Sequence, residues 1–359
     1  MTKPLVAGCL ILVLLLNVGD VECRHRRDED EDPVYKLFVF GDGAADNGNY
    51  PNAGLNQGSR AWYAPYGMSD DDNGNRPSGR LSDCLVQSDY LARILGYHES
   101  PPPYAAYRPR RRNNRTDQAG MNFANASAGV WYVGPKVSEQ VDQFRSLIND
   151  GAITKQDLDN SVALIAVTGR DYSEIVDSAS DGYVASFADV VTKEVARMVA
   201  QLQEVGVGKV VVNSLPPLGC TPWTASRFSD YDHCDARANS YSDAHNRALA
   251  DKLRDMDDVM LLDVNMAFTE LLKPGSGMSG SFKFSHGSRP CCEGKDKDSY
   301  CGQYDDGRRP RFDVCSNPDE YFFWDFIHPT DAGWAAVMQL FQRPIMRFLD
   351  ISKFNNIVD

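Results

Sequence analysis

The chain has 359 residues, of which 42% are hydrophobic and 24% charged. This is an ordinary globular composition, and it excludes a disordered, collagen-like or coiled-coil protein. The 37 Lys and Arg residues against 50 Asp and Glu residues give a formal net charge of −13. Because a protein this acidic repels phosphate backbones, we expect no nucleic-acid partner.

Residues 1–23 predict a signal peptide. Lys3 is followed by an apolar and small-residue run from Pro4 to Leu16, with a cleavage position near Cys23. The run is too short to cross about 30 Å of hydrocarbon, which disfavours the alternative of an uncleaved membrane anchor. We therefore expect a secreted protein, extracellular or in the cell wall, with no membrane span.

After a charged linker at 24–34, residues 35–359 are predicted to form a single domain. Residues 51–80 are rich in Gly, Asn, Asp and Pro and predict a long surface loop. Apolar runs predict strands at 36–40, 121–124, 162–167, 209–212 and 259–264. Helical periodicity predicts helices at 184–202, 235–254 and 331–349, the last kinked or broken at Pro344.

Short apolar strands that alternate with long helices indicate an α/β fold with a parallel sheet covered on both faces. In such sheets ligands bind at the carboxyl ends of the strands. The segments Gly41 to Gly43, Gly169 to Asp171 and Leu215 to Gly219 follow predicted strands. We therefore expect these three segments to share one edge of the sheet and to form the site.

The cysteines and sequons fit an oxidising compartment. With Cys9 and Cys23 in the leader, seven cysteines remain, and Cys84 is predicted to be the odd free thiol. Three disulfides are expected, with pairing left open, among Cys220, Cys234, Cys291, Cys292, Cys301 and Cys315. A zinc site is the alternative, disfavoured because no CxxC pair occurs. Asn114 and Asn125 begin glycosylation sequons, the second in an apolar stretch where burial would block it.

Six sequence blocks resemble the plant GDSL esterase/lipases, a branch of the SGNH hydrolases. In chain order they are 38–49 (FVFGDGAADNGN), 122–124 (NFA), 167–172 (VTGRDY), 215–222 (LPPLGCTP), the paired Cys291-Cys292, and 323–330 (FWDFIHPT). The resemblance covers residue 35 to the C-terminus. It implies a three-layer α/β/α sandwich, flavodoxin-like, around a five-stranded and mostly parallel sheet, and ester hydrolysis without a cofactor or metal.

The resemblance also implies site residues. Asp325 and His328 match the family's acid and base, which activate a serine on the first strand–helix turn. Gly43 stands at the nucleophile position and has no side chain to react. At the oxyanion positions the family's donors correspond to the Gly43 backbone, Ser127 and Arg170, the last in place of an asparagine.

These substitutions predict that serine-type catalysis is lost, since 34–58 holds no Ser, Thr or Cys to take over. Three functions remain open. The first is a catalytically inactive protein that still binds a small ester, lipid or acylated glycan. The second is an active hydrolase or acyltransferase with a non-standard nucleophile, and the third is a non-catalytic partner of another secreted enzyme. Ser127 and a water activated by His328 are the candidate replacements. Alternatively, the Asp325–His328 pair only packs its loop, and Arg170 pairs with Asp42 or Asp171.

Overall fold

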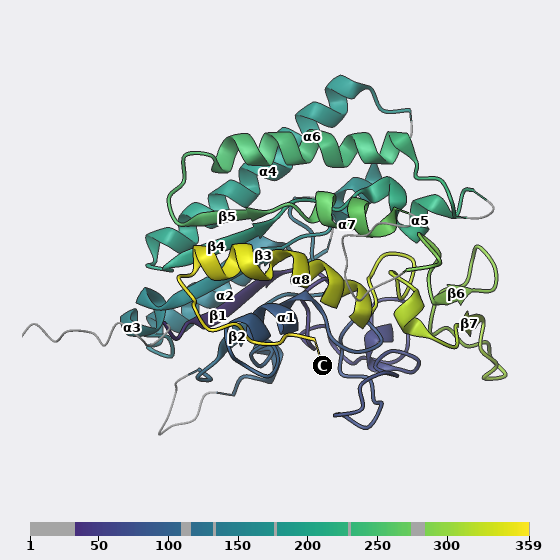
Figure 1. Ribbon diagram of the computed structural model, residues 1–359, viewed down its shortest axis with the longest axis horizontal. Helices are drawn as coiled ribbons and strands as arrows, with labels where there is room; N and C mark the ends of the chain where they lie inside the picture. The colour runs from purple at the N-terminus through teal and green to yellow at the C-terminus, as the bar shows by residue number, and fades with distance from the viewer. Residues whose placement is uncertain are drawn as a thin grey trace, which may run out of the picture. The chain divides into compact units, whose positions relative to one another are not determined.

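A five-stranded parallel sheet forms the centre of the protein in the computed structural model, which describes residues 33–108, 116–131, 134–175, 178–228, 231–273 and 284–358 (Figure 1). The strand order is β2-β1-β3-β4-β5. The strands are β1 (Lys36–Gly41), β2 (Gly120–Asn122), β3 (Ser161–Ala166), β4 (Lys209–Asn213) and β5 (Val259–Leu262). The α/β class and the five-stranded parallel sheet are therefore confirmed.

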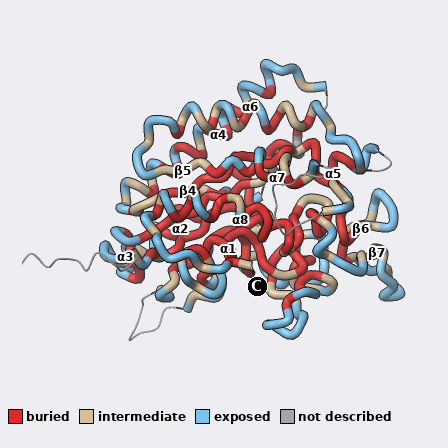
Figure 2. Tube along the Cα trace, in the orientation of Figure 1, coloured by how far each residue is buried: buried red, intermediate tan, exposed pale blue. Residues whose placement is uncertain are grey.

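Helices cover both faces of this sheet. They are α1 (Gln87–Ile94), α2 (Val137–Asn149), α3 (Lys155–Asp159), α4 (Asp181–Glu204), α5 (Pro222–Ala225), α6 (Ala236–Leu253), α7 (Val264–Leu272) and α8 (Asp331–Phe348). Alternate residues of β1 enter different cores. Leu37 and Val39 join a cluster with Trp334 of α8, whereas Phe38 and Phe40 join one with Phe144 of α2. Figure 2 shows the strands buried between the two helical layers, the three-layer sandwich that the resemblance implies.

Most ends of the predicted elements shift by one to three residues, and two differences have a clear local cause. The fifth strand ends at Leu262 rather than at 264, because the Asp263 side chain accepts the Met266 N–H and caps α7. The last helix is not broken at Pro344 but continues to Phe348. Burial of Phe341 and Ile345 on either side of the proline compensates for the backbone hydrogen bond that it removes.

Three disulfides join the six cysteines that were predicted to pair, and Cys84 is free. The pairs are Cys220–Cys234, Cys291–Cys315 and Cys292–Cys301. The last two lie around the two-stranded sheet of β6 (Cys292–Gly294) and β7 (Phe312–Val314). The zinc alternative for these cysteines is wrong.

Several sequence predictions fall outside the described residues, namely the signal peptide, nearly all of the 24–34 linker and the Asn114 sequon. Within the described ranges, no helix is long and apolar enough to cross a membrane. The Asn125 side chain is half-buried and accepts hydrogen bonds from the backbone and hydroxyl of Ser127.

Candidate active site

A cleft of about 410 Å³ opens at the carboxyl edge of the sheet. Its volume lies within the range of about 300–1,000 Å³ that is typical of small-molecule sites. Gly43 after β1, Arg170 after β3, His328 before α8 and Ser127 all line it. The fold therefore brings together the four cleft residues that the sequence analysis selected. Asp325 lies behind His328 with its side chain fully buried.

The Asp325 carboxylate holds the His328 ring in a fixed orientation. Nδ1 of His328 lies 2.9 Å from Oδ1 and 3.0 Å from Oδ2 of Asp325. Oδ1 also accepts the backbone N–H groups of Ile327 and His328, at 2.9 and 2.8 Å. A carboxylate only accepts hydrogen bonds, so Nδ1 of the neutral ring carries the proton and Nε2 is the basic nitrogen.

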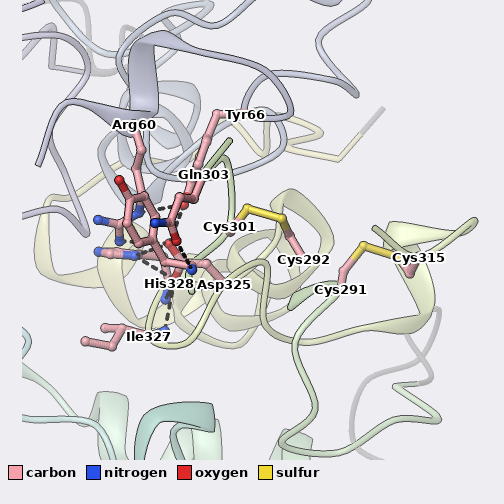
Figure 3. Close-up of a disulfide and its surroundings, with 11 residues drawn as sticks. Arg60, Tyr66, Cys291, Cys292, Cys301, Gln303, Cys315, Asp325, Ile327 and His328 are labelled. Atoms are coloured by element: carbon pink, nitrogen blue, oxygen red, sulfur yellow. Dashed lines mark hydrogen bonds and ion pairs between the residues drawn. A yellow bond between two sulfur atoms is a disulfide. The ribbon is translucent and has the colours of Figure 1, made fainter. Parts of the chain in front are cut away.

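Two residues missed by the sequence analysis complete the surroundings of this carboxylate. Oδ2 of Asp325 accepts a hydrogen bond from the Arg60 guanidinium at 3.0 Å and one from the Tyr66 hydroxyl at 2.9 Å. Arg60 also donates to the Tyr66 hydroxyl at 2.7 Å. Figure 3 shows Arg60 and Tyr66 meeting at Asp325, with two disulfides to one side.

The charges around Asp325 oppose the effect of its burial. Burial alone would raise the pKa of Asp325, but the positive charges of His328 and Arg60 and the hydrogen bonds hold it well below the ordinary value. Asp325 is therefore ionised at neutral pH.

The disulfide-bonded segment supports the loop that carries this pair. The backbone N–H groups of Cys291 and Cys292 donate to the carbonyls of Phe323 and Trp324, at 2.9 and 2.7 Å. Both cysteines are disulfide-bonded, and Trp324 directly precedes Asp325. The bridges thus fix the backbone immediately before Asp325.

Gly43 faces the basic nitrogen of His328 without an intervening side chain. A Cβ atom built on Gly43 would lie 2.7 Å from Nε2 of His328 and 2.8 Å from Cδ1 of Leu81. Carbon contacts of this kind prefer about 3.5–4.0 Å. The imidazole and Leu81 therefore occupy the space that a serine side chain would need.

Ser127, at one oxyanion position, and Asp42, next to Gly43, both make hydrogen bonds within the protein. The Ser127 hydroxyl donates to Asn125 Oδ1 at 3.0 Å. The Asp42 carboxylate accepts from the Thr168 N–H and hydroxyl at 2.6 and 2.8 Å. Burial raises the pKa of Asp42, while these bonds oppose that effect.

The Arg170 side chain also lines the cleft. The alternative that Arg170 pairs with Asp42 or Asp171 is wrong, because its side chain is exposed and has no carboxylate partner among the described residues. The Asp171 carboxylate instead accepts the N–H groups of Val130 and Trp131, both at 2.8 Å.

Comparison with known proteins gives the family. The model of the GDSL-like lipase/acylhydrolase family matches residues 37–341. The chain belongs to this family. A GDSL esterase/lipase of Arabidopsis thaliana is 32% identical over 324 residues, covering 86% of each chain. A second from the same plant is 31% identical over 320 residues, 86% of this chain and 87% of the relative. A GDSL lipase of Tanacetum cinerariifolium is 28% identical over 324 residues, 85% of this chain and 82% of the relative.

Within this GDSL-family chain, the sequence selected the residues that carry recognisable chemistry but not those that surround them. Arg60, Tyr66 and Leu81 come from or directly follow the segment predicted as a surface loop, and all three are buried. Their only sequence signal is their large size within a stretch of small and polar residues. Among the described residues, no group of His, Cys, Asp or Glu is placed to hold a metal ion.

Proposed function

We propose that this chain is a secreted GDSL-family protein that has lost serine-type ester hydrolysis and uses its cleft to bind a small ester, lipid or acylated glycan. The family's relatives are esterases and lipases by name. Secretion is supported by the apolar N-terminal run and by the three disulfides, since such bonds persist in oxidising compartments.

The observation that carries this proposal is the Gly43–His328 contact. In the family's mechanism a serine hydroxyl attacks the acyl carbon while the histidine takes its proton. Here the basic Nε2 lies 2.7 Å from the position of the missing Cβ. His328 is oriented for proton transfer by Asp325, but among the described residues no hydroxyl is hydrogen-bonded to its Nε2.

The energetics make residual serine-type turnover negligible. Removing the serine costs about 10⁶ in turnover in a measured hydrolase. The loss of one oxyanion donor costs roughly another 10²–10³. Arg170 replaces that donor with a longer, charged group whose hydrogen-bonding geometry differs.

Ser127 is not favoured as a replacement nucleophile. A nucleophile needs hydrogen-bond contact with its base. The Ser127 hydroxyl instead donates to Asn125 Oδ1. The position therefore favours a structural role for this hydroxyl.

Hydrolysis of short- and medium-chain nitrophenyl esters by the secreted protein tests the proposal. Wild type and Ser127→Ala should both show no turnover, and Gly43→Ser/Arg170→Asn should gain turnover. The structure adds one expectation, that Gly43→Ser alone recovers less, because the new side chain must first displace His328 and Leu81. Turnover by wild type that Ser127→Ala abolishes would instead establish a relocated nucleophile.

Binding is tested separately by melting temperature. A ligand that binds only the native state must stabilise it, so acetylated oligosaccharides and lipid esters should raise the melting temperature with concentration. If none does, the third possibility gains support, in which the protein acts as a partner of another enzyme and the cleft has no role.

A further inference from the structure

We infer that the cleft binds a carboxylic acid, with the carboxylate held by Arg170 and the Gly43 N–H and an apolar or aromatic tail lying along Leu218, Trp223 and Ile327. This inference rests on the proposed function and adds to it the chemical class of the ligand. It follows from the charge, the free donors and the apolar wall of one cleft.

The cleft gathers arginines although the protein carries a formal net charge of −13. Three arginines line it, and Asp42 is the only carboxylate among its described lining residues. The Asp42 charge is already bound by the Thr168 backbone and hydroxyl. An arginine without a carboxylate partner in such a cleft attracts an anion there.

Two of the three arginines are already paired. Arg60 lies 3.0 Å from Asp325, and Arg227 lies 3.0 Å from Asp235. Arg170 has no such partner in the described part of the chain, so its guanidinium is available to a ligand. The planar fork of a guanidinium matches a carboxylate with two parallel hydrogen bonds.

The Gly43 backbone supplies a second donor. The N–H groups on either side are taken, that of Asp42 by the Ala166 carbonyl and that of Ala44 by the Asp42 carboxylate. The Gly43 N–H has no acceptor among the described residues. Donors that would stabilise a transient oxyanion in an ester hydrolase also suit a permanent carboxylate, and replacing a neutral amide by Arg170 favours the full charge.

The rest of the cleft suits an uncharged tail. Trp223 is 57% exposed, an unusual amount for so large an apolar side chain, and its ring lies 5.5 Å from that of Phe326. Leu218 and Ile327 lie in the same lining. A tail placed there covers apolar surface that now faces water.

Isothermal calorimetry with paired ligands tests the inference. The acids are octanoate and 3-phenylpropanoate, and each is compared with its amide, which has the same tail without the charge. The variants are Arg170→Asn, which removes the charge, and Arg170→Lys, which keeps the charge but loses the fork. Arg343→Asn is the matched control, an exposed arginine of α8 outside the cleft lining.

Wild type should bind at least one acid at least about tenfold more tightly than its amide, equivalent to about 1.4 kcal/mol. Arg170→Asn should lose at least about tenfold in acid affinity, with amide affinity unchanged, and Arg170→Lys should fall between. Arg343→Asn should match wild type. Raising the salt concentration should weaken acid binding and leave amide binding unaffected.

The inference is overturned if acid and amide bind equally, or if Arg170→Asn leaves acid affinity unchanged. In both cases the cleft still binds ligands, so the proposed function stands. The inference also fails if neither acid binds. The proposed function is then judged by its own two assays, ester hydrolysis and stabilisation by acetylated oligosaccharides.

Discussion

Gly43→Ala places a methyl group where His328 and Leu81 already lie. The new Cβ would be 2.7 Å from His328 Nε2 and 2.8 Å from Leu81 Cδ1, against preferred separations of about 3.5–4.0 Å. Forcing extra carbon into a packed site costs about 1–3 kcal/mol. Without the overlap, Gly→Ala would stabilise by about 0.4–1 kcal/mol through the unfolded chain. We expect a net destabilisation of up to about 2.6 kcal/mol, the difference between these two effects, measured by urea unfolding.

A double-mutant cycle assigns this cost to the contact with His328. In the His328→Ala background the nearer obstacle is gone, so Gly43→Ala should cost at least about 1 kcal/mol less than in wild type. Gly182→Ala is the matched control, because a Cβ at Gly182 has its nearest neighbour 4.0 Å away. It should leave stability unchanged or improve it. If Gly43→Ala stabilises as Gly182→Ala does, the basic nitrogen does not stand where the nucleophile position requires it.

Three further predictions concern stability, pH and the free thiol. Arg60→Met should lower the unfolding free energy by about 3–5 kcal/mol, because it leaves the buried Asp325 charge without its arginine; a change below about 1 kcal/mol would show that the pair contributes little. Burial and the neighbouring Asp83 raise the pKa of Asp331 to about 7. The folded state then holds a proton that the unfolded chain releases near pH 4. The contribution of this group to the unfolding free energy therefore falls by up to about 1.4 kcal/mol per pH unit as the pH rises toward 7. Asp331→Asn should therefore gain stability relative to wild type between pH 5 and pH 8 in thermal unfolding, and a constant difference would contradict the shift. Thiol labelling of the mature protein should find one free cysteine, at Cys84, slow to react when folded because burial raises its pKa; a second thiol, or fast labelling, would contradict the disulfide assignment.

The sheet and the cysteine bridges were predictable because their signals are local. Runs such as 36–40 are apolar throughout, as strands buried on both faces must be. The six bridged cysteines followed from their number and the predicted compartment, but their pairing did not, since it depends on which loops meet in space. The sequence predicted a kink or a break at Pro344 without deciding between them, and α8 continues because core packing outweighs local helix preference.

The candidate site was predictable only in part. Asp325 and His328 stand three residues apart in a recognisable block, so their contact could be expected. Arg60 reaches the same carboxylate from 265 positions away, and no local pattern encodes that meeting. The close approach of His328 and Leu81 to Gly43 likewise depends on how three separate segments pack together. The sequence could show that the serine is absent, but not that its space is filled.

Ester hydrolysis by wild type and His328→Ala tests the central claim most directly. The claim is that no nucleophile stands in front of this base. Wild type should show no turnover above the background of the ester, and His328→Ala should match it, because the base has no hydroxyl proton to remove. Gly43→Ser/Arg170→Asn, with and without His328→Ala, provides the positive control for a working base. A wild-type activity that falls about 100-fold or more in His328→Ala would mean that His328 still performs catalysis, and the account would be wrong.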